Sequence, residues 1–132
     1  MQRGVSFGVA LLLSCTPAGA DDIFTNRPAL SEPEQPAQAY ARCEQIRPML
    51  SGMTEPDDRI DLSVVGELTL VRTDGALWYL GLCTDIQVLC VTYESNDMKP
   101  GERVFMKGGY IRRSPDHILL DPCLATRREP GE

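Results

Sequence analysis

The feature that most constrains the fold is a change in hydrophobic period at Ile60. From there to Leu120 apolar side chains recur every second residue, which is the period of a strand with one buried face. Turn-forming sequences divide this region into five runs, with breaks at 73–75, 84–87, 95–102, 114–116 and 121–122. The Asp74-Gly75 pair at the first break is a strong hairpin signal. The sequence therefore predicts five short antiparallel strands between about residues 60 and 120.

Glycines lie inside these predicted strands, at positions 66, 81, 108 and 109. Internal glycines mark bulges and sharp bends, so the strands are expected to coil into a closed sheet. Upstream, the period is helical over about Ala37 to Ile46, and we expect Pro48 to end that helix. The predicted fold is mainly β, a five-stranded antiparallel barrel with one short N-terminal helix. A small β-sandwich is the alternative.

The strand pattern resembles the small OB-fold barrels of exported bacterial envelope proteins. The resemblance lies in VVGELTLVRTDGALWYLGLC, KPGERVFMKGGYIRR and HILLDPC, which span about half of the chain. An OB barrel often has a helix between its third and fourth strands, and residues 95–102 are too few for one. We expect the helix around Cys43 to cover that barrel end instead. The resemblance implies ligand binding across the second and third strands, with stacking aromatic side chains.

The first twenty residues have the form of a secretory signal peptide. Arg3 is followed by an apolar run from Val5 to Leu13, and Ala18-Gly19-Ala20 gives a small-residue cleavage site. Cleavage after Ala20 predicts a periplasmic or secreted protein; lipidation of Cys15, which would anchor it to a membrane, is the alternative. The expected organisation is a signal peptide (1–20), a disordered proline-bearing linker (21–38), the helix and barrel (39–124) and a flexible tail (125–132).

Four cysteines remain under either processing route, and an even number in an exported domain indicates two disulfides. If the strands flanking 84–87 form a hairpin, Cys83 and Cys90 are expected to face each other, which leaves Cys43 for Cys123. Pairing of Cys43 with Cys83 or with Cys90 stays open. No C-x2-C pair occurs and the spacings fit no zinc finger, so no metal and no cofactor are predicted.

The chain has a formal net charge of −6, and loss of Arg3 with the leader would make it −7. An acidic surface repels polyphosphate, so the predicted partners are an envelope protein, a peptide or a glycan, and no nucleic acid. Contact with a membrane is expected only if Cys15 is lipidated. Among binding residues, Tyr79 is expected to point outward while Trp78 joins the core. Tyr93, Arg112 and Arg113 complete the predicted binding set.

No catalytic signature is present: the serines are outside G-x-S-x-G, and no C-x-x-C pair or paired carboxylates occur. We therefore expect a non-catalytic, disulfide-stabilised binding module rather than an enzyme. A redox-sensitive or stress-responsive periplasmic protein is the alternative. A second resemblance, to the periplasmic haem chaperone of cytochrome c maturation, implies haem handling through a histidine. The one histidine, His117, precedes the last predicted strand and lacks that family's local motif.

Overall fold

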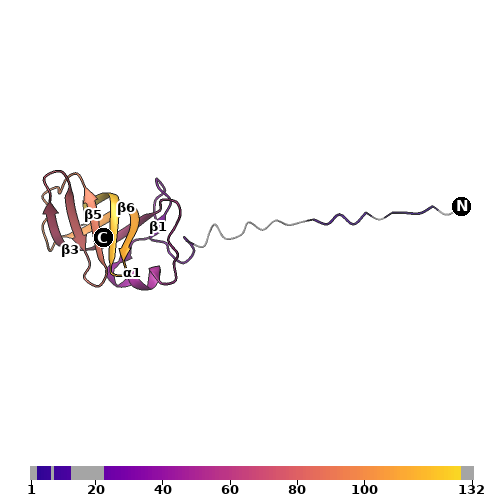
Figure 1. The fold of residues 1–132 in the computed structure, drawn as a ribbon, viewed down its shortest axis with the longest axis horizontal. Helices are drawn as coiled ribbons and strands as arrows, with labels where there is room; N and C mark the ends of the chain where they lie inside the picture. The colour runs from indigo at the N-terminus through magenta and orange to yellow at the C-terminus, as the bar shows by residue number, and fades with distance from the viewer. Residues whose placement is uncertain (1–2, 7, 13–22, 129–132) are drawn as a thin grey trace.

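The computed structural model describes residues 3–6, 8–12 and 23–128. The predicted cleavage site at Ala20 and the alternative lipid site at Cys15 lie outside these residues. Within the described ranges, no helix combines the length and the apolar character needed to cross a bilayer. The folded part begins near Ile23 and forms one barrel with a short helix at its foot (Figure 1).

Five strands close the barrel, and they confirm the predicted fold class. They are β3 (Asp61–Thr73), β4 (Trp78–Leu82), β5 (Gln87–Thr92), β6 (Arg103–Ser114) and β7 (His117–Arg127). Their order is β3-β4-β5-β7-β6, and β6 pairs back with β3 to close the sheet. The β5–β7 pair is parallel and the other barrel pairs are antiparallel. This mainly β, closed five-stranded arrangement is OB-like.

Strand β3 holds the barrel together because it pairs with two strands in succession. Its first half, 61–67, pairs with β6, and its second half, 68–73, pairs with β4. The register shifts between Leu68 and Leu70, where the strand changes partner. This division leaves one edge of the first half without a barrel neighbour.

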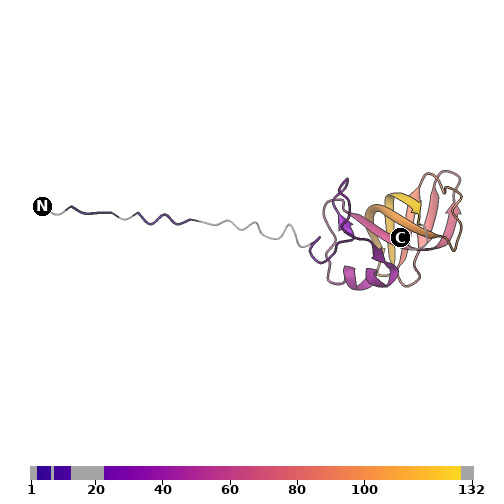
Figure 2. The same cartoon turned by 180° about the vertical axis from the view of Figure 1, so that it is seen from behind.

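The N-terminal segment covers that edge. Strand β1 (Leu30–Ser31) pairs antiparallel with β3 at Asp61 and Leu62, and β2 (Ala41–Arg42) pairs parallel with it further along. Ala29 and Leu30 are buried in the core. Over its described part, from residue 23 on, the structure therefore differs from the disordered linker predicted for 21–38. The physical reason is that an open strand edge exposes unpaired backbone groups, and this segment supplies their partners. Figure 2 shows the segment packed along one side of the barrel.

Helix α1 spans Cys43–Leu50, so it begins later than predicted and continues past Pro48. Pro48 lacks the N–H that would bond the carbonyl of Glu44, and Glu44 is exposed, so water can satisfy that carbonyl. Arg47 of this helix bonds Asp85 in the β4–β5 turn and Asp116 in the β6–β7 turn. The helix thus lies at the barrel end opposite the β5–β6 connection. The expectation that it would cover the β5–β6 end is not met, and buried Met98 of that connection lies there instead.

The barrel interior is filled with aliphatic side chains. Leu80 and Leu82 of β4 are fully buried, as the alternation predicts. Trp78, two residues earlier on the same strand, is only partly buried, because it pairs with Thr73 and Thr92 at the ends of their strands. It is therefore not the core residue that was expected. The other fully buried residues of the barrel strands include Leu62, Val64, Val88, Val104, Met106, Ile118 and Leu120.

All four cysteines of the described chain form disulfides, but the preferred pairing was wrong. Cys43 bonds Cys83, a pairing left open from the sequence, and we call it the helix bridge. Cys90 bonds Cys123, and we call it the barrel bridge. The β4–β5 hairpin forms as predicted, but its register places Leu80, and not Cys83, opposite Cys90. Cys83 lies beyond the end of β4 with a φ of 69°, so it leaves the ladder and faces α1.

The last strand is longer than predicted. β7 passes through a cis Asp121-Pro122 bond and continues to Arg127, where the sequence predicted a turn and a flexible tail. Its far half pairs with 104–108 of β6. A side chain at Gly108 would bring a Cβ within 2.5 Å of the Pro122 carbonyl oxygen. The glycine thus allows the two strands to approach closely enough to continue pairing.

Candidate binding surfaces

The predicted binding residues do not form one site. Tyr93 is 79% exposed just beyond the end of β5. Arg112 and Arg113 lie near the far end of β6, beside the β6–β7 turn. The Arg112 guanidinium donates to the carbonyls of Ser114 and Pro115, so it stabilises that turn. Arg113 is exposed. The tyrosine and the arginines are therefore at opposite ends of the barrel.

Tyr79 is partly buried on the outer side of β4, and its hydroxyl is already engaged. It donates to the Asp74 carboxylate in the β3–β4 turn at 2.8 Å. This hydrogen bond raises the pKa of Tyr79, because ionisation would place two negative charges side by side. Backbone N–H groups of Leu77 and Ala76, together with Tyr79, lower the pKa of Asp74. Tyr79 thus stabilises the hairpin turn.

Aromatic side chains meet elsewhere, on the outer face of β6 and β7. The Tyr40 and Phe105 rings pack in an edge-to-face arrangement, with centroids 4.8 Å apart and an interplanar angle of 63°. The Arg128 guanidinium lies 4.6 Å from the Tyr40 centroid and 5.5 Å from that of Phe105. Leu124 is 75% exposed on the neighbouring strand, where it pairs with Lys107. We call these five residues the aromatic platform.

The geometry of the sheet explains why these side chains share a face. Val104 and Met106 point into the barrel and are fully buried, so Phe105, between them, points outward. Lys107 follows at the next outward position, and its ammonium donates to the carbonyl of Gln35 at 2.7 Å. This bond attaches the N-terminal segment to β6 and holds Tyr40 near Phe105. The platform is therefore shared between the barrel and the segment that covers it.

The platform is basic although the chain is acidic. Lys107 and Arg128 belong to it, and Arg103 is next to it because its carbonyl accepts a hydrogen bond from the Arg128 N–H. Arg127 lies on the same strand but is paired with Glu102 at 2.8 Å. That contact lowers the pKa of Glu102 and offsets one positive charge. The remaining arrangement is an apolar patch with a cationic rim.

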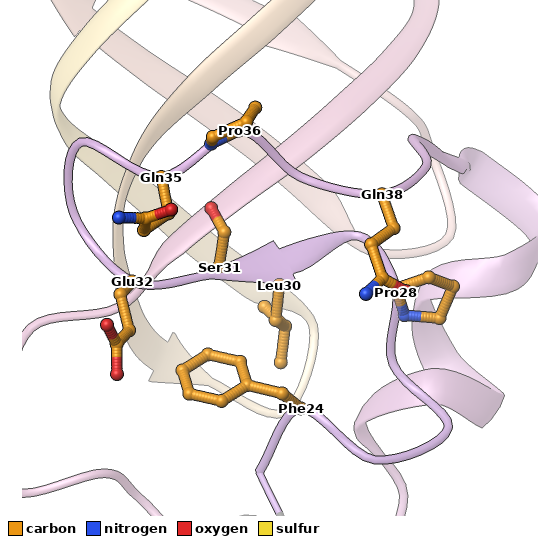
Figure 3. A pocket seen from close by; sticks show the side chains of 8 residues that line it. All are labelled: Phe24, Pro28, Leu30, Ser31, Glu32, Gln35, Pro36 and Gln38. Carbon is orange, nitrogen blue, oxygen red and sulfur yellow. The ribbon is translucent and has the colours of Figure 1, made fainter.

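A second surface feature is a pocket of about 300 Å³ between β1 and the loop that follows it. Figure 3 shows the eight side chains that line it, which we call the N-terminal pocket: Phe24, Pro28, Leu30, Ser31, Glu32, Gln35, Pro36 and Gln38. The loop is closed at its base by a hydrogen bond from the Ala39 N–H to the Pro28 carbonyl. The Lys107 contact with Gln35 fixes its middle. The pocket wall is therefore held at both places.

The described residues give little support for a metal or cofactor site. No group of three or more His, Cys, Asp or Glu side chains is placed there to hold a metal ion. The four described cysteines are disulfide-bonded. His117 begins β7 beside the β6–β7 turn. This arrangement of the described residues gives no support for haem handling.

Both surface features were missed at the sequence level. Tyr40, Phe105 and Leu124 are far apart in the chain, and only barrel closure brings them together. The pocket lies in a segment whose prolines favoured disorder. One signal was available: Phe105 and Lys107 flank Met106 in a strand of predicted alternation, so two outward positions were already identifiable.

Comparison with known proteins adds a likeness in fold. No family model matches the chain, and no curated protein matches it. Among solved structures, it resembles a chain in the crystal structure of the S. pombe Stn1-ten1 complex. The identity is 16%, the TM-score is 0.39, and the match covers 54% of this chain and 60% of the other. This chain thus corresponds to less than two thirds of that protein's length, and the likeness carries no argument about function.

One expectation is corrected at this point. Net charge led to the prediction of no nucleic-acid partner, and that exclusion does not stand. OB folds bind oligonucleotides as well as oligosaccharides, and this barrel is OB-like. The local charge also differs from the net charge, since the aromatic platform is basic. The exclusion is withdrawn.

Proposed function

We propose that the protein is an exported, non-catalytic binding module whose partner is a protein, peptide or glycan. The observation that carries this proposal is the aromatic platform. Leu124 is 75% exposed beside a packed aromatic pair, on a surface whose rim is cationic. Tyrosine, arginine and exposed apolar side chains are enriched where partners bind. The barrel interior is filled with side chains, so a partner is taken on the outside.

The charge and geometry of the platform favour an extended acidic peptide segment of a partner protein. Lys107 and Arg128 can pair with carboxylates of a partner, and the exposed Leu124 side chain can make an apolar contact with the same partner. A flat ring would find little free ring face to stack on, because the Arg128 guanidinium lies over the Tyr40 and Phe105 rings and the two rings pack against each other. An acidic segment with one or two apolar side chains matches this arrangement.

The two disulfides support the proposal of export. Disulfides persist in oxidising compartments, and small exported domains use them to supplement a limited core. Intact-mass measurement of the protein from its native host tests this part. A mature chain that starts at Asp21 is expected. A full-length chain with reduced cysteines would contradict export, and a diacylglyceryl group on Cys15 would replace the soluble form by an anchored one.

Site-specific photo-crosslinking tests the platform. A photoreactive phenylalanine analogue at position 124 is expected to capture one partner in intact cells, and the same analogue at position 111 serves as the matched control. Ile111 is also an exposed apolar residue, 37% exposed, but it lies at the far end of β6. The captured protein is then purified, and its affinity is measured for the wild type, Leu124→Glu and Ile111→Glu. Binding lost only in Leu124→Glu supports the proposal.

Two outcomes would overturn it. Equal capture at positions 124 and 111 would show that the platform is not a specific surface. Saturable binding of a single-stranded oligonucleotide to the platform, abolished by Leu124→Glu and unmatched by any acidic peptide, would replace the peptide partner by nucleic acid. Fluorescence anisotropy with a labelled poly-glutamate peptide and a labelled oligonucleotide of equal charge separates these arms.

A further inference from the structure

We propose that the N-terminal pocket binds one neutral sugar residue, such as the terminal unit of a glycan. This site is separate from the aromatic platform; the inference rests on the glycan part of the proposed function and gives that ligand its own site. Its volume of about 300 Å³ is at the lower end of the range for small-ligand sites, so it fits a single ring rather than a chain.

A buried serine hydroxyl provides the first argument. Ser31 is 6% exposed, and its Oγ has no hydrogen-bond partner. In Figure 3 this hydroxyl points from β1 toward the loop that carries Gln35 and Pro36, so it faces the pocket. Leaving a buried hydroxyl unpaired costs about 1–3 kcal/mol. A ligand hydroxyl at this position would satisfy it.

The other polar groups of the pocket provide the second argument. Gln35 and Gln38 offer carboxamides, which both donate and accept, and Glu32 offers a carboxylate acceptor. Figure 3 shows Glu32 and Gln38 on opposite sides, with Ser31 between them. Hydrogen-bonding groups placed at several points around a pocket match hydroxyls that radiate around a ring. The flat edge of a nucleobase would use only one of those directions.

The apolar lining and the charge complete the case. Phe24, Pro28 and Pro36 provide surfaces for the C–H faces of a sugar, and an aromatic ring is suited to that contact. None of the described residues that line the pocket is basic and Glu32 is acidic, while the nearby Lys107 ammonium is bound to the Gln35 carbonyl, so the lining does not favour an anionic group. The ligand class is therefore an uncharged polyhydroxylated ring.

The loop contacts indicate that the site exists before a ligand arrives. The Ala39–Pro28 hydrogen bond closes the loop, and the Lys107–Gln35 contact attaches it to β6. β1 also pairs with β3 directly beneath Ser31. A pre-formed site avoids part of the ordering cost of binding.

The experiment is a titration of the ¹⁵N-labelled mature chain, residues 21–132, with glucose, N-acetylglucosamine and their neutral disaccharides. At least one sugar is expected to produce saturable shifts at the Ser31 backbone amide and at the Gln35 and Gln38 side-chain amides. A lysine-containing tripeptide and uridine serve as competing probes. The platform variant Leu124→Glu is expected to bind the sugar normally, so failure of the platform and failure of the pocket are distinguishable.

Two serine variants supply the matched control. Ser63 is also fully buried with an unpaired hydroxyl, but it is not among the residues that line the pocket. Both Ser31→Ala and Ser63→Ala remove an unsatisfied buried group and should fold. Ser31→Ala is expected to weaken sugar binding about 3- to 10-fold, the equivalent of one hydrogen bond, and Ser63→Ala to leave it unchanged.

Three results would overturn the proposal. The first is shifts that stay linear and small for every sugar. The second is equal affinity of Ser31→Ala and the wild type. The third is saturation of the pocket by the tripeptide or by uridine but by no sugar, which would assign the site to a different ligand class.

Discussion

The two disulfides should differ in how much they stabilise the fold, although they close loops of similar length. The helix bridge joins residues 40 apart, and the barrel bridge joins residues 33 apart. By loop-closure entropy alone, each is worth about 4 kcal/mol. The difference lies in burial. Both cysteines of the barrel bridge are buried, with Cys90 0% and Cys123 6% exposed, whereas in the helix bridge Cys83 is 6% exposed and Cys43 is only partly buried.

Replacing both cysteines of the barrel bridge by alanine therefore leaves two small voids in the core. Each methyl-sized void costs about 1 kcal/mol, so Cys90→Ala/Cys123→Ala should lose about 6 kcal/mol. Cys43→Ala/Cys83→Ala should lose about 5 kcal/mol, because only Cys83 leaves a buried void, and less if the helix detaches without unfolding the barrel. The gap of at least about 1 kcal/mol corresponds to about 0.3–1 M in the urea midpoint.

Urea unfolding followed by Trp78 fluorescence measures both variants against the wild type. Hydrogen exchange adds a local readout: the helix-bridge variant should lose protection over residues 29–50 while the barrel strands keep theirs. The reasoning is refuted if the helix-bridge variant is as destabilised as the barrel-bridge variant. It is also refuted if hydrogen exchange in the helix-bridge variant rises equally over residues 29–50 and over the barrel strands, because the N-terminal segment would then not detach separately from the barrel.

Three further outcomes are expected. Limited reduction with dithiothreitol, followed by alkylation and mass spectrometry, should label the helix bridge before the barrel bridge, since Cys43 is the most exposed of the four bonded cysteines. Labelling in the opposite order would contradict this. Gly108→Ala should destabilise the fold by about 2–3 kcal/mol, because its Cβ would meet the Pro122 carbonyl oxygen, and an unchanged melting temperature would show that β7 can shift. Arg47→Gln should lower the melting temperature at neutral pH, and the difference from the wild type should narrow as the pH falls below about 4. The reason is that hydrogen bonding to Arg47 lowers the pKa of Asp85, so the stabilisation from this contact is lost as the Asp85 carboxylate becomes protonated. If the difference in melting temperature between Arg47→Gln and the wild type stays constant with pH, the Arg47–Asp85 contact is not its cause.

The barrel was predictable because its signals are local. A two-residue period, a β-turn at Asp74-Gly75 and glycines inside strands each depend on neighbouring residues, and together they specify short strands in a closed sheet. Which cysteines pair depends on the register of the β4–β5 hairpin. Cys83 leaves the ladder one residue after Leu82, and no sequence pattern records that departure.

The N-terminal segment was mispredicted for a different reason. Its prolines and polar residues favour disorder when the segment is considered alone. Its order comes from the open edge of β3, which exists only because that strand divides its pairing between β6 and β4. The aromatic platform depends on the same event, because Tyr40 reaches Phe105 only when the segment lies along the barrel. The local sequence of this segment cannot show that it will pair with a strand edge that forms only in the folded barrel.

This segment is what distinguishes the surface of the protein from that of a bare barrel. It supplies Tyr40 to the aromatic platform and all eight lining side chains to the N-terminal pocket. It is attached at three kinds of contact: strand pairing of β1 and β2 with β3, the Lys107–Gln35 hydrogen bond, and the helix bridge at its far end. Of these, only the helix bridge is covalent, and it is also the more accessible disulfide. Both proposed binding sites therefore depend on a segment that is cross-linked to the barrel by the more accessible of the two disulfides, so we expect reduction of the helix bridge to weaken both sites.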